Sequence, residues 1–214
     1  MTSSYTDKVF DYRALRLLMG IIAFVMPFVV NLVSSTPLSS ISASYHTEAR
    51  DIFVGLIFVV SAFMMAYKGH TKTEIWVSGV ASLAAAVVAL SPTSCDTCAP
   101  DIRSKIHYFG AAIMFGILAY FCLVPFRKHT RGQGGKKERR ARVYLICGWI
   151  IVLCILTIGI GNIILPDATM KSSHLTYWAE VVALEAFGVA WIVAGKVIGP
   201  LVDEEDALKF KLFE

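Results

Sequence analysis

The sequence predicts an all-α integral membrane protein, a single bundle of six transmembrane helices (residues 1–214) with both termini in the cytoplasm. Of its 214 residues, 56% are hydrophobic and 17% are charged, with a mean hydropathy of +0.63. Soluble domains contain about 45–50% apolar and about 25% charged residues. This composition therefore excludes a water-soluble globular enzyme, and its hydrophobicity excludes a disordered chain.

Six apolar runs, separated by short polar segments, account for most of the chain. Each run is close to the roughly 20 residues that a helix needs to cross a bilayer. The runs do not alternate with a period of two, so they predict helices rather than the strands of a barrel. The predicted spans are residues 14–34, 52–67, 74–91, 106–126, 143–165 and 175–198. No small-residue cleavage site follows the first run closely, so we interpret it as an uncleaved helix rather than a signal peptide.

The distribution of lysine and arginine predicts the orientation. The N-terminal segment, the 68–73 and 127–142 loops and the C-terminal end of the chain contain sixteen of these residues, and the alternate loops contain four. Cytoplasmic loops are enriched in Lys and Arg. Both termini and both basic loops are therefore predicted to be cytoplasmic, in a bacterial inner membrane or a eukaryotic cell membrane.

The 127–142 segment, RKHTRGQGGKKERRAR, is the most basic part of the chain. Its glycines predict a flexible loop, and its charge could hold anionic lipid head groups or act only as a topology determinant. Nucleic acid is not an expected partner, because no aromatic residues are interleaved with the charge. The tail at 199–214, with acidic residues at 203–206, is expected to be a solvated terminus.

Small residues recur four positions apart on two of the predicted spans. They are Ser82, Ala85, Ala86 and Ala89 on the third span and Ala186, Ala190 and Ala194 on the sixth. Such stripes allow close helix packing in lipid. They fit packing within the chain, a homo-oligomer or a partner in a membrane complex.

Three of the five histidines lie on the predicted extracytoplasmic side, where a span begins to return inward. These are His46, His107 and His174. Imidazole is the commonest metal ligand, and three histidines with an open fourth position make a catalytic zinc site. We therefore predict them as candidate zinc ligands. The alternative is ordinary interface residues, since no HxxxH or HExxH pair is present. His70 and His129 lie in cytoplasmic basic loops and are expected to be solvated.

Acidic residues in unusual places are the second candidate feature. Glu180 and Glu185 lie in the last predicted span, roughly 8 Å and 15 Å along the helix at 1.5 Å per residue. A carboxylate at that depth faces the bundle interior or a wet cavity. Glu180 could join His107 or His174 as a catalytic group, whereas interhelical hydrogen bonds are the structural alternative for both acids. Asp51, at the start of the second span, could act as a base or serve as a helix cap.

Two cysteines, Cys95 and Cys98, lie in the outer segment SPTSCDTCAPD. A local disulfide is the expected state, because a zinc site would need a second CxxC. Pro100 and Asp101 indicate a loop, whereas thiol oxidoreductases place CxxC at a helix N-terminus.

The stretch ISASYHTEARDIFVGLIF, residues 41–58, resembles the first outer loop and second helix of a group of six-span membrane proteins. The shared pattern is an Ile-Ser loop followed by Phe53, Gly55, Leu56 and Ile57. The group includes the DRAM-type autophagy modulators, the GPI-anchor lipid-remodelling proteins and bacterial relatives of unknown function. The resemblance implies a lipid-linked role by association and carries over no catalytic residue.

Three functions follow from these patterns, and the sequence leaves open whether the chain is an enzyme. The first is a lipid-handling protein with a His/acid site at the extracytoplasmic face. If it is an enzyme, a metal would activate water for lipid hydrolysis or remodelling, with Asp51 or Glu180 as the base. The second is a small proton- or cation-coupled transporter or channel that uses Glu180 and Glu185. The third is a non-catalytic subunit of a membrane complex.

Overall fold

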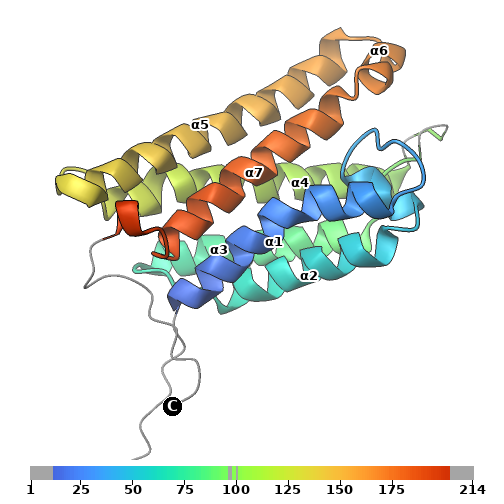
Figure 1. The fold of residues 1–214 in the computed structure, drawn as a ribbon. Coiled ribbons are helices and arrows are strands. Elements are labelled where there is room, and N and C mark those ends of the chain that lie inside the picture. The colour runs from blue at the N-terminus through green and yellow to red at the C-terminus, as the bar shows by residue number, and fades with distance from the viewer. Residues whose placement is uncertain (1–11, 96–97, 100, 203–214) are drawn as a thin grey trace, which may run out of the picture.

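The computed structural model describes residues 12–95, 98–99 and 101–202, and every regular element in this part of the chain is a helix. Long helices run side by side along one bundle (Figure 1). They are α1 (Tyr12–Val33), α2 (Arg50–Ala66), α3 (Lys72–Leu90), α4 (Ile102–Phe121), α5 (Gly135–Ile164) and α7 (Leu175–Ala194). The short elements are η1 (Ser42–His46), η2 (Cys122–Phe126), α6 (Asp167–Ser172) and η3 (Gly199–Leu201). The predicted all-α class is confirmed.

Five helical segments are long and apolar enough to cross a membrane: α1, α3, α4 continued by η2, α5 and α7. The second predicted span forms α2, whose 17 residues are fewer than the roughly 20 of a typical crossing. Large apolar side chains face outward, with Leu32 and Ile163 each 85% exposed. These features support a helical membrane protein, while the count of six spans and the orientation of the termini stay predictions.

The long helices form a closed ring of neighbours. In the order α1, α2, α3, α4, α5 and α7, each packs on the next, and α7 packs back on α1 (Figure 1). The α1–α7 contact is close because glycines meet there. A Cβ on Gly20 would lie 2.7 Å from the Ile192 amide nitrogen, and one on Gly188 would lie 2.9 Å from the Gly20 carbonyl oxygen. The predicted stripe on α7 is buried in the same chain: Ala186, Ala190 and Ala194.

The two ends of the bundle differ in charge. We call the end that holds the start of α1, the α2–α3 and α4–α5 connections and η3 the basic end (Figure 1). The described residues of the other connections, at 34–49, 91–95, 98–99, 101 and 165–174, lie at the opposite end. An aromatic cluster lies beneath the basic end, where Tyr67 and Phe126 have ring centroids 5.4 and 5.3 Å from that of Trp191. These packed rings lie directly beneath the connections of the basic end.

The basic segment predicted as a flexible loop is helical from Gly135 onward. Gly132, Gly134 and Gly135 have positive φ angles, which glycine adopts without steric cost. The amide of Gly132 donates to Glu138 Oε2 at 2.7 Å and fastens the turn to the new helix. The connection between helices is therefore shorter than 127–142, and the lysines and arginines from residue 136 onward have fixed positions on α5.

Candidate metal centre

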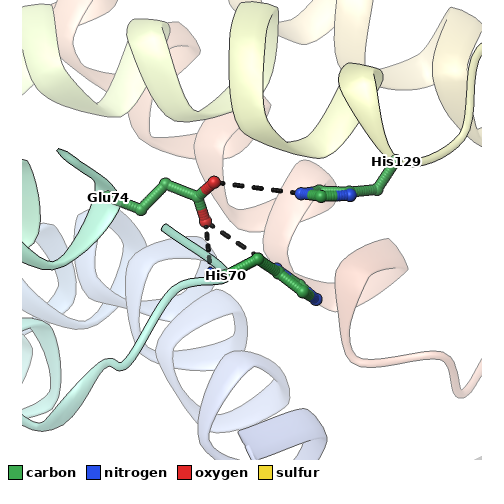
Figure 2. A group of neighbouring side chains, drawn as sticks. All are labelled: His70, Glu74 and His129. Atoms are coloured by element: carbon green, nitrogen blue, oxygen red, sulfur yellow. Dashed lines mark hydrogen bonds and ion pairs between the residues drawn. The ribbon is translucent and has the colours of Figure 1, made fainter. Parts of the chain in front are cut away.

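Three side chains that could bind a metal converge at the basic end. His70 Nδ1 lies 3.7 Å from Glu74 Oε2, and His129 Nε2 lies 3.8 Å from Glu74 Oε1. One ligand atom from each residue lies within 4.8 Å of the other two. Figure 2 shows the carboxylate of Glu74 pointing toward both imidazole rings. The side chains of His70 and His129 are 57% and 39% exposed, as expected of solvated residues, but both rings also lie beside a carboxylate that is only 4% exposed.

Glu74 is held in place by the start of α3. Thr71 is the N-cap of that helix, and its hydroxyl accepts a hydrogen bond from the Glu74 amide at 3.2 Å. In return, Glu74 Oε2 accepts from the His70 amide at 2.9 Å. The pair resembles a capping box, in which a Glu three residues after the N-cap Thr accepts from the N-cap amide, but here the carboxylate accepts from the amide one residue earlier, that of His70. This hydrogen bond fixes the carboxylate beside the His70 ring.

His129 reaches the same point from the other side of the basic end. Pro125 lies in η2, a single π-helical turn that continues α4. Proline has no amide hydrogen and disrupts the regular α-helical bonding of the preceding turn, and π-turns of this kind often occur at functional sites. After η2 the Thr130 hydroxyl donates to the Phe126 carbonyl at 2.8 Å. The connection is thereby held close to the bundle, with His129 above Glu74.

The donor set fits a zinc-like divalent ion. Zinc binds histidine nitrogen and carboxylate oxygen at about 2.0–2.2 Å, so ligand atoms around a tetrahedral ion lie roughly 3.3 Å apart. The distances of 3.7 and 3.8 Å run to the two different oxygens of Glu74, and one ligand atom from each residue lies within 4.8 Å of the others, so the rings and the carboxylate would have to rotate inward to reach that spacing. Two histidines and one glutamate are also a known catalytic zinc ligand set, with the fourth position left for water.

A cavity of about 300 Å³ adjoins the three side chains. Aromatic residues form part of its wall: Tyr67, Phe126 and Tyr144. Basic residues form another part: Arg16, Lys137, Arg140 and Lys196. A ligand in this cavity would touch both a metal bound at the cluster and several positive charges.

The electrostatics of the cavity favour a neutral His70. Burial is the main cause that lowers the pKa of His70, and the nearby His129 and Arg16 lower it further against the opposing effect of Glu74. A neutral imidazole has a free lone pair, which is the form that binds a metal. Proton loss and metal binding therefore favour the same state of the ring.

The three histidines predicted to bind a metal at the opposite end do not form a group of this kind among the described residues. Each instead has a ring nitrogen within hydrogen-bonding distance of a backbone carbonyl. His46 pairs with Thr93 at 2.7 Å, His107 with Ser91 at 2.7 Å and His174 with Leu38 at 2.9 Å. Two of the three rings therefore contact the segment that follows α3, and the third contacts the loop that follows α1.

The predicted acids have separate surroundings. Glu180 Oε2 accepts a hydrogen bond from the Ile41 amide at 2.6 Å and so ties α7 to the loop that follows α1. Glu185 has one buried oxygen, Oε1, with no hydrogen-bond partner among the described residues. Asp51 lies exposed in the first turn of α2. Ala49, not Asp51, takes the N-cap position of that helix, and its small side chain makes no capping hydrogen bond.

Cys95 and Cys98 are joined by a disulfide, with their Cα atoms 5.1 Å apart, so the predicted pairing is confirmed. The acidic run at 203–206 lies outside the described residues.

One sequence signal could have indicated part of the candidate metal centre. His70 and Glu74 stand four residues apart at the start of a predicted span, and a Glu three residues after Thr71 predicts a helix start that brings its carboxylate back toward the preceding residues. His129 stands 59 residues after His70 and 55 residues after Glu74. It approaches them only because of the turn at Pro125. Comparison with protein-family models, curated proteins and solved structures finds no match to this chain.

Proposed function

We propose that this chain is a membrane-embedded, metal-dependent hydrolase that acts on a membrane lipid at the basic end of the bundle. The observation that carries the proposal is the convergence of His70, Glu74 and His129 beside a cavity. The sequence predicts a His/acid site of this chemistry at the extracytoplasmic face, and the proposal moves it to the other end.

The ligand set supports hydrolysis in particular. A metal held by three protein groups keeps a coordination position for water and lowers the pKa of that water to near 7. The metal-bound hydroxide would attack the carbon or phosphorus atom of the ester. The bond to the leaving oxygen breaks, and that oxygen takes up a proton from solvent, which balances the one released when the bound water ionised, and leaves as an alcohol.

The surroundings of the site support a lipid substrate. The outside of the bundle is apolar, and the cavity opens among basic residues at one end of the candidate membrane helices. Basic residues at a membrane surface attract anionic lipid head groups. A lipid could therefore present its ester at the cavity while its acyl chains stay in the bilayer. The resemblance of residues 41–58 to lipid-remodelling proteins points to the same substrate.

The test is lipid turnover by the full chain reconstituted in lipid nanodiscs. We expect head-group or fatty-acid release that stops with a chelator and returns with zinc. His129→Ala should abolish the release, because its half-exposed ring supplies one ligand. Gly79→Ala should retain it, because a Cβ added there meets nothing within 4 Å and all three ligands stay in place. Release that continues in the chelator, or equally in His129→Ala, would overturn the proposal.

A second candidate, a proton- or cation-coupled transporter, draws support from the buried and unpartnered oxygen of Glu185. Intramembrane carboxylates commonly mark ion pathways. This function would give ion flux in proteoliposomes that Glu185→Gln abolishes and His129→Ala leaves intact. Lipid release that His129→Ala abolishes and Glu185→Gln leaves intact, without ion flux, would support the hydrolase.

A further inference from the structure

We propose that the cavity beside the metal centre recognises a phosphate group of a phosphomonoester, such as the head group of phosphatidic acid. This inference names the substrate class of the site and so rests on the proposed function. It comes from the charge on the cavity wall, which the metal ligands do not explain.

The wall carries far more positive than negative charge. Arg16 from α1, Lys137 and Arg140 from α5 and Lys196 after α7 all line the cavity. Glu74 is the one carboxylate among the described lining residues, and its oxygens already pair with the His70 amide and the Thr71 hydroxyl. A bound divalent metal would add two further positive charges. The cavity is therefore suited to an anion that carries more than one negative charge.

The guanidinium of Arg16 is fixed in the cavity wall by two aromatic side chains. Its guanidinium carbon lies 5.4 Å from the centroid of the Tyr67 ring and 5.9 Å from that of Phe126. One terminal nitrogen donates to the Tyr67 hydroxyl at 3.2 Å, while the buried Nε has no partner among the described residues. A planar guanidinium fixed by aromatic rings is the group that best matches the geometry of phosphate oxygens.

The opposite wall is fixed by α5. Arg140 is only 2% exposed and donates to the Leu201 carbonyl at 2.7 Å. Lys137, one turn earlier, is half-buried and makes no ion pair with an acid among the described residues. Positive groups on α1 and α5 thus face one space of about 300 Å³. That size is at the small end of ligand pockets, which span about 300–1,000 Å³, and it suits a head group rather than a whole lipid.

The test measures anion binding to the full chain in a chelator, so that the metal does not contribute. The probes are inorganic phosphate in detergent and nanodiscs of phosphatidylcholine with or without phosphatidic acid. We expect one or both phosphate probes to bind, and phosphatidylcholine alone not to bind. Binding of phosphatidic acid alone would identify a lipid head group, and binding of inorganic phosphate alone would identify a soluble phosphoester.

Two cavity variants and one surface variant decide whether the cavity is responsible. Arg16→Gln and Lys137→Gln should each weaken phosphate binding roughly tenfold or more, since each removes a charge-assisted hydrogen bond. Lys128→Gln removes an exposed charge at the same end but outside the cavity, and should leave the affinity unchanged. Lys137 lies near the start of α5, so its variant tests the inference even if Arg16→Gln fails to fold.

Absence of phosphate binding would overturn the inference, as would an equal loss in Lys128→Gln, which would show diffuse attraction to the basic surface. The two proposals fail separately. Zinc binding without phosphate binding would leave the hydrolase proposal in place and remove this one. Phosphate binding in a protein that never takes up a metal would show an anion site without the proposed chemistry.

Discussion

Gly69 makes room for the carboxylate of Glu74. A Cβ added to Gly69 would overlap both the Cβ and the Oε2 atoms of Glu74, and the φ angle of Gly69 is not in the positive range. The requirement for glycine is therefore one of space. The carboxylate that caps α3 and faces two histidines keeps its position only while residue 69 has no side chain.

Gly69→Ala should displace Glu74 and weaken metal binding, while the protein still folds. We expect zinc affinity to fall by roughly 10–100-fold, the usual effect of disturbing the groups that orient a metal ligand. Gly79→Ala is the matched control. Gly79 lies on α3, as Glu74 does, and a Cβ added there meets nothing within 4 Å. Equal zinc affinities in the two variants, measured by competition with a chromophoric chelator, would contradict the placement of Glu74.

Glu180 should hold the loop that follows α1 in place through its hydrogen bond with the Ile41 amide. Glu180→Ala leaves the buried Ile41 amide without its acceptor, which costs about 1–3 kcal/mol and should make that amide exchange with deuterium faster. Glu180→Gln keeps an oxygen acceptor and should keep the amide protected. If Glu180→Gln exposes the amide as much as Glu180→Ala does, the neutral oxygen is not a sufficient acceptor and the charge itself is needed.

The contact between α1 and α7 should tolerate no added volume. Gly188→Ala places a methyl group against the Gly20 carbonyl, and overpacking of this kind costs about 1–3 kcal/mol of unfolding free energy. Gly159→Ala on α5 has open space around the new atom and should be neutral or slightly stabilising. Thermal unfolding in detergent compares the two, and equal midpoints would show that the helices do not meet at these glycines.

Asp101, the N-cap of α4 at the end opposite the basic end, should make the stability of the fold depend on pH. The amide of Ser104 donates to Asp101 Oδ1 at 2.8 Å, and hydrogen bonds from Ser104 are the main cause that lowers the pKa of Asp101. A carboxyl with a lower pKa in the folded state than the usual value of about 3.9 stabilises the fold above that value. This contribution is lost as the pH falls through the folded-state pKa.

Asp101→Asn removes the titrating group but keeps a capping side chain. We therefore expect the wild-type protein to lose more stability than Asp101→Asn between pH 5 and pH 3, when both are unfolded by denaturant in detergent. Parallel pH profiles for the two proteins would show that the charge of Asp101 adds nothing to the cap.

The fold class followed from the sequence because apolar runs and helix length are local properties. The second span is the exception in length: the predicted run at 52–67 lies in α2 (Arg50–Ala66) and its C-cap, and this helix has only 17 residues. The extent of the basic loop was also misjudged. Its glycines predicted flexibility, yet three of them supply positive φ angles in a tight turn that starts α5. Glycine composition does not distinguish a flexible loop from a turn that only glycine can form.

The group of possible metal ligands among the described residues lies at the other end of the bundle from the predicted one. His46, His107 and His174 stand at corresponding positions of three spans, but their rings are near backbone carbonyls. His70 and His129 lie among lysines and arginines, which predicts solvent exposure. The His70 amide is joined to the Glu74 carboxylate by a hydrogen bond, and His129 approaches it through the π-turn, a three-dimensional feature that spacing along the chain does not show.

The most direct test of the central claim is the zinc content of the purified wild-type protein beside Glu74→Gln. Glutamine keeps a side-chain oxygen that can accept from the His70 amide as Glu74 Oε2 does, so this variant should keep the start of α3 and lose only the anionic ligand. The account predicts near-stoichiometric zinc in the wild-type protein and little or none in Glu74→Gln. Zinc absent from both proteins after incubation with the ion, or equal in both, would contradict a metal centre at His70, Glu74 and His129.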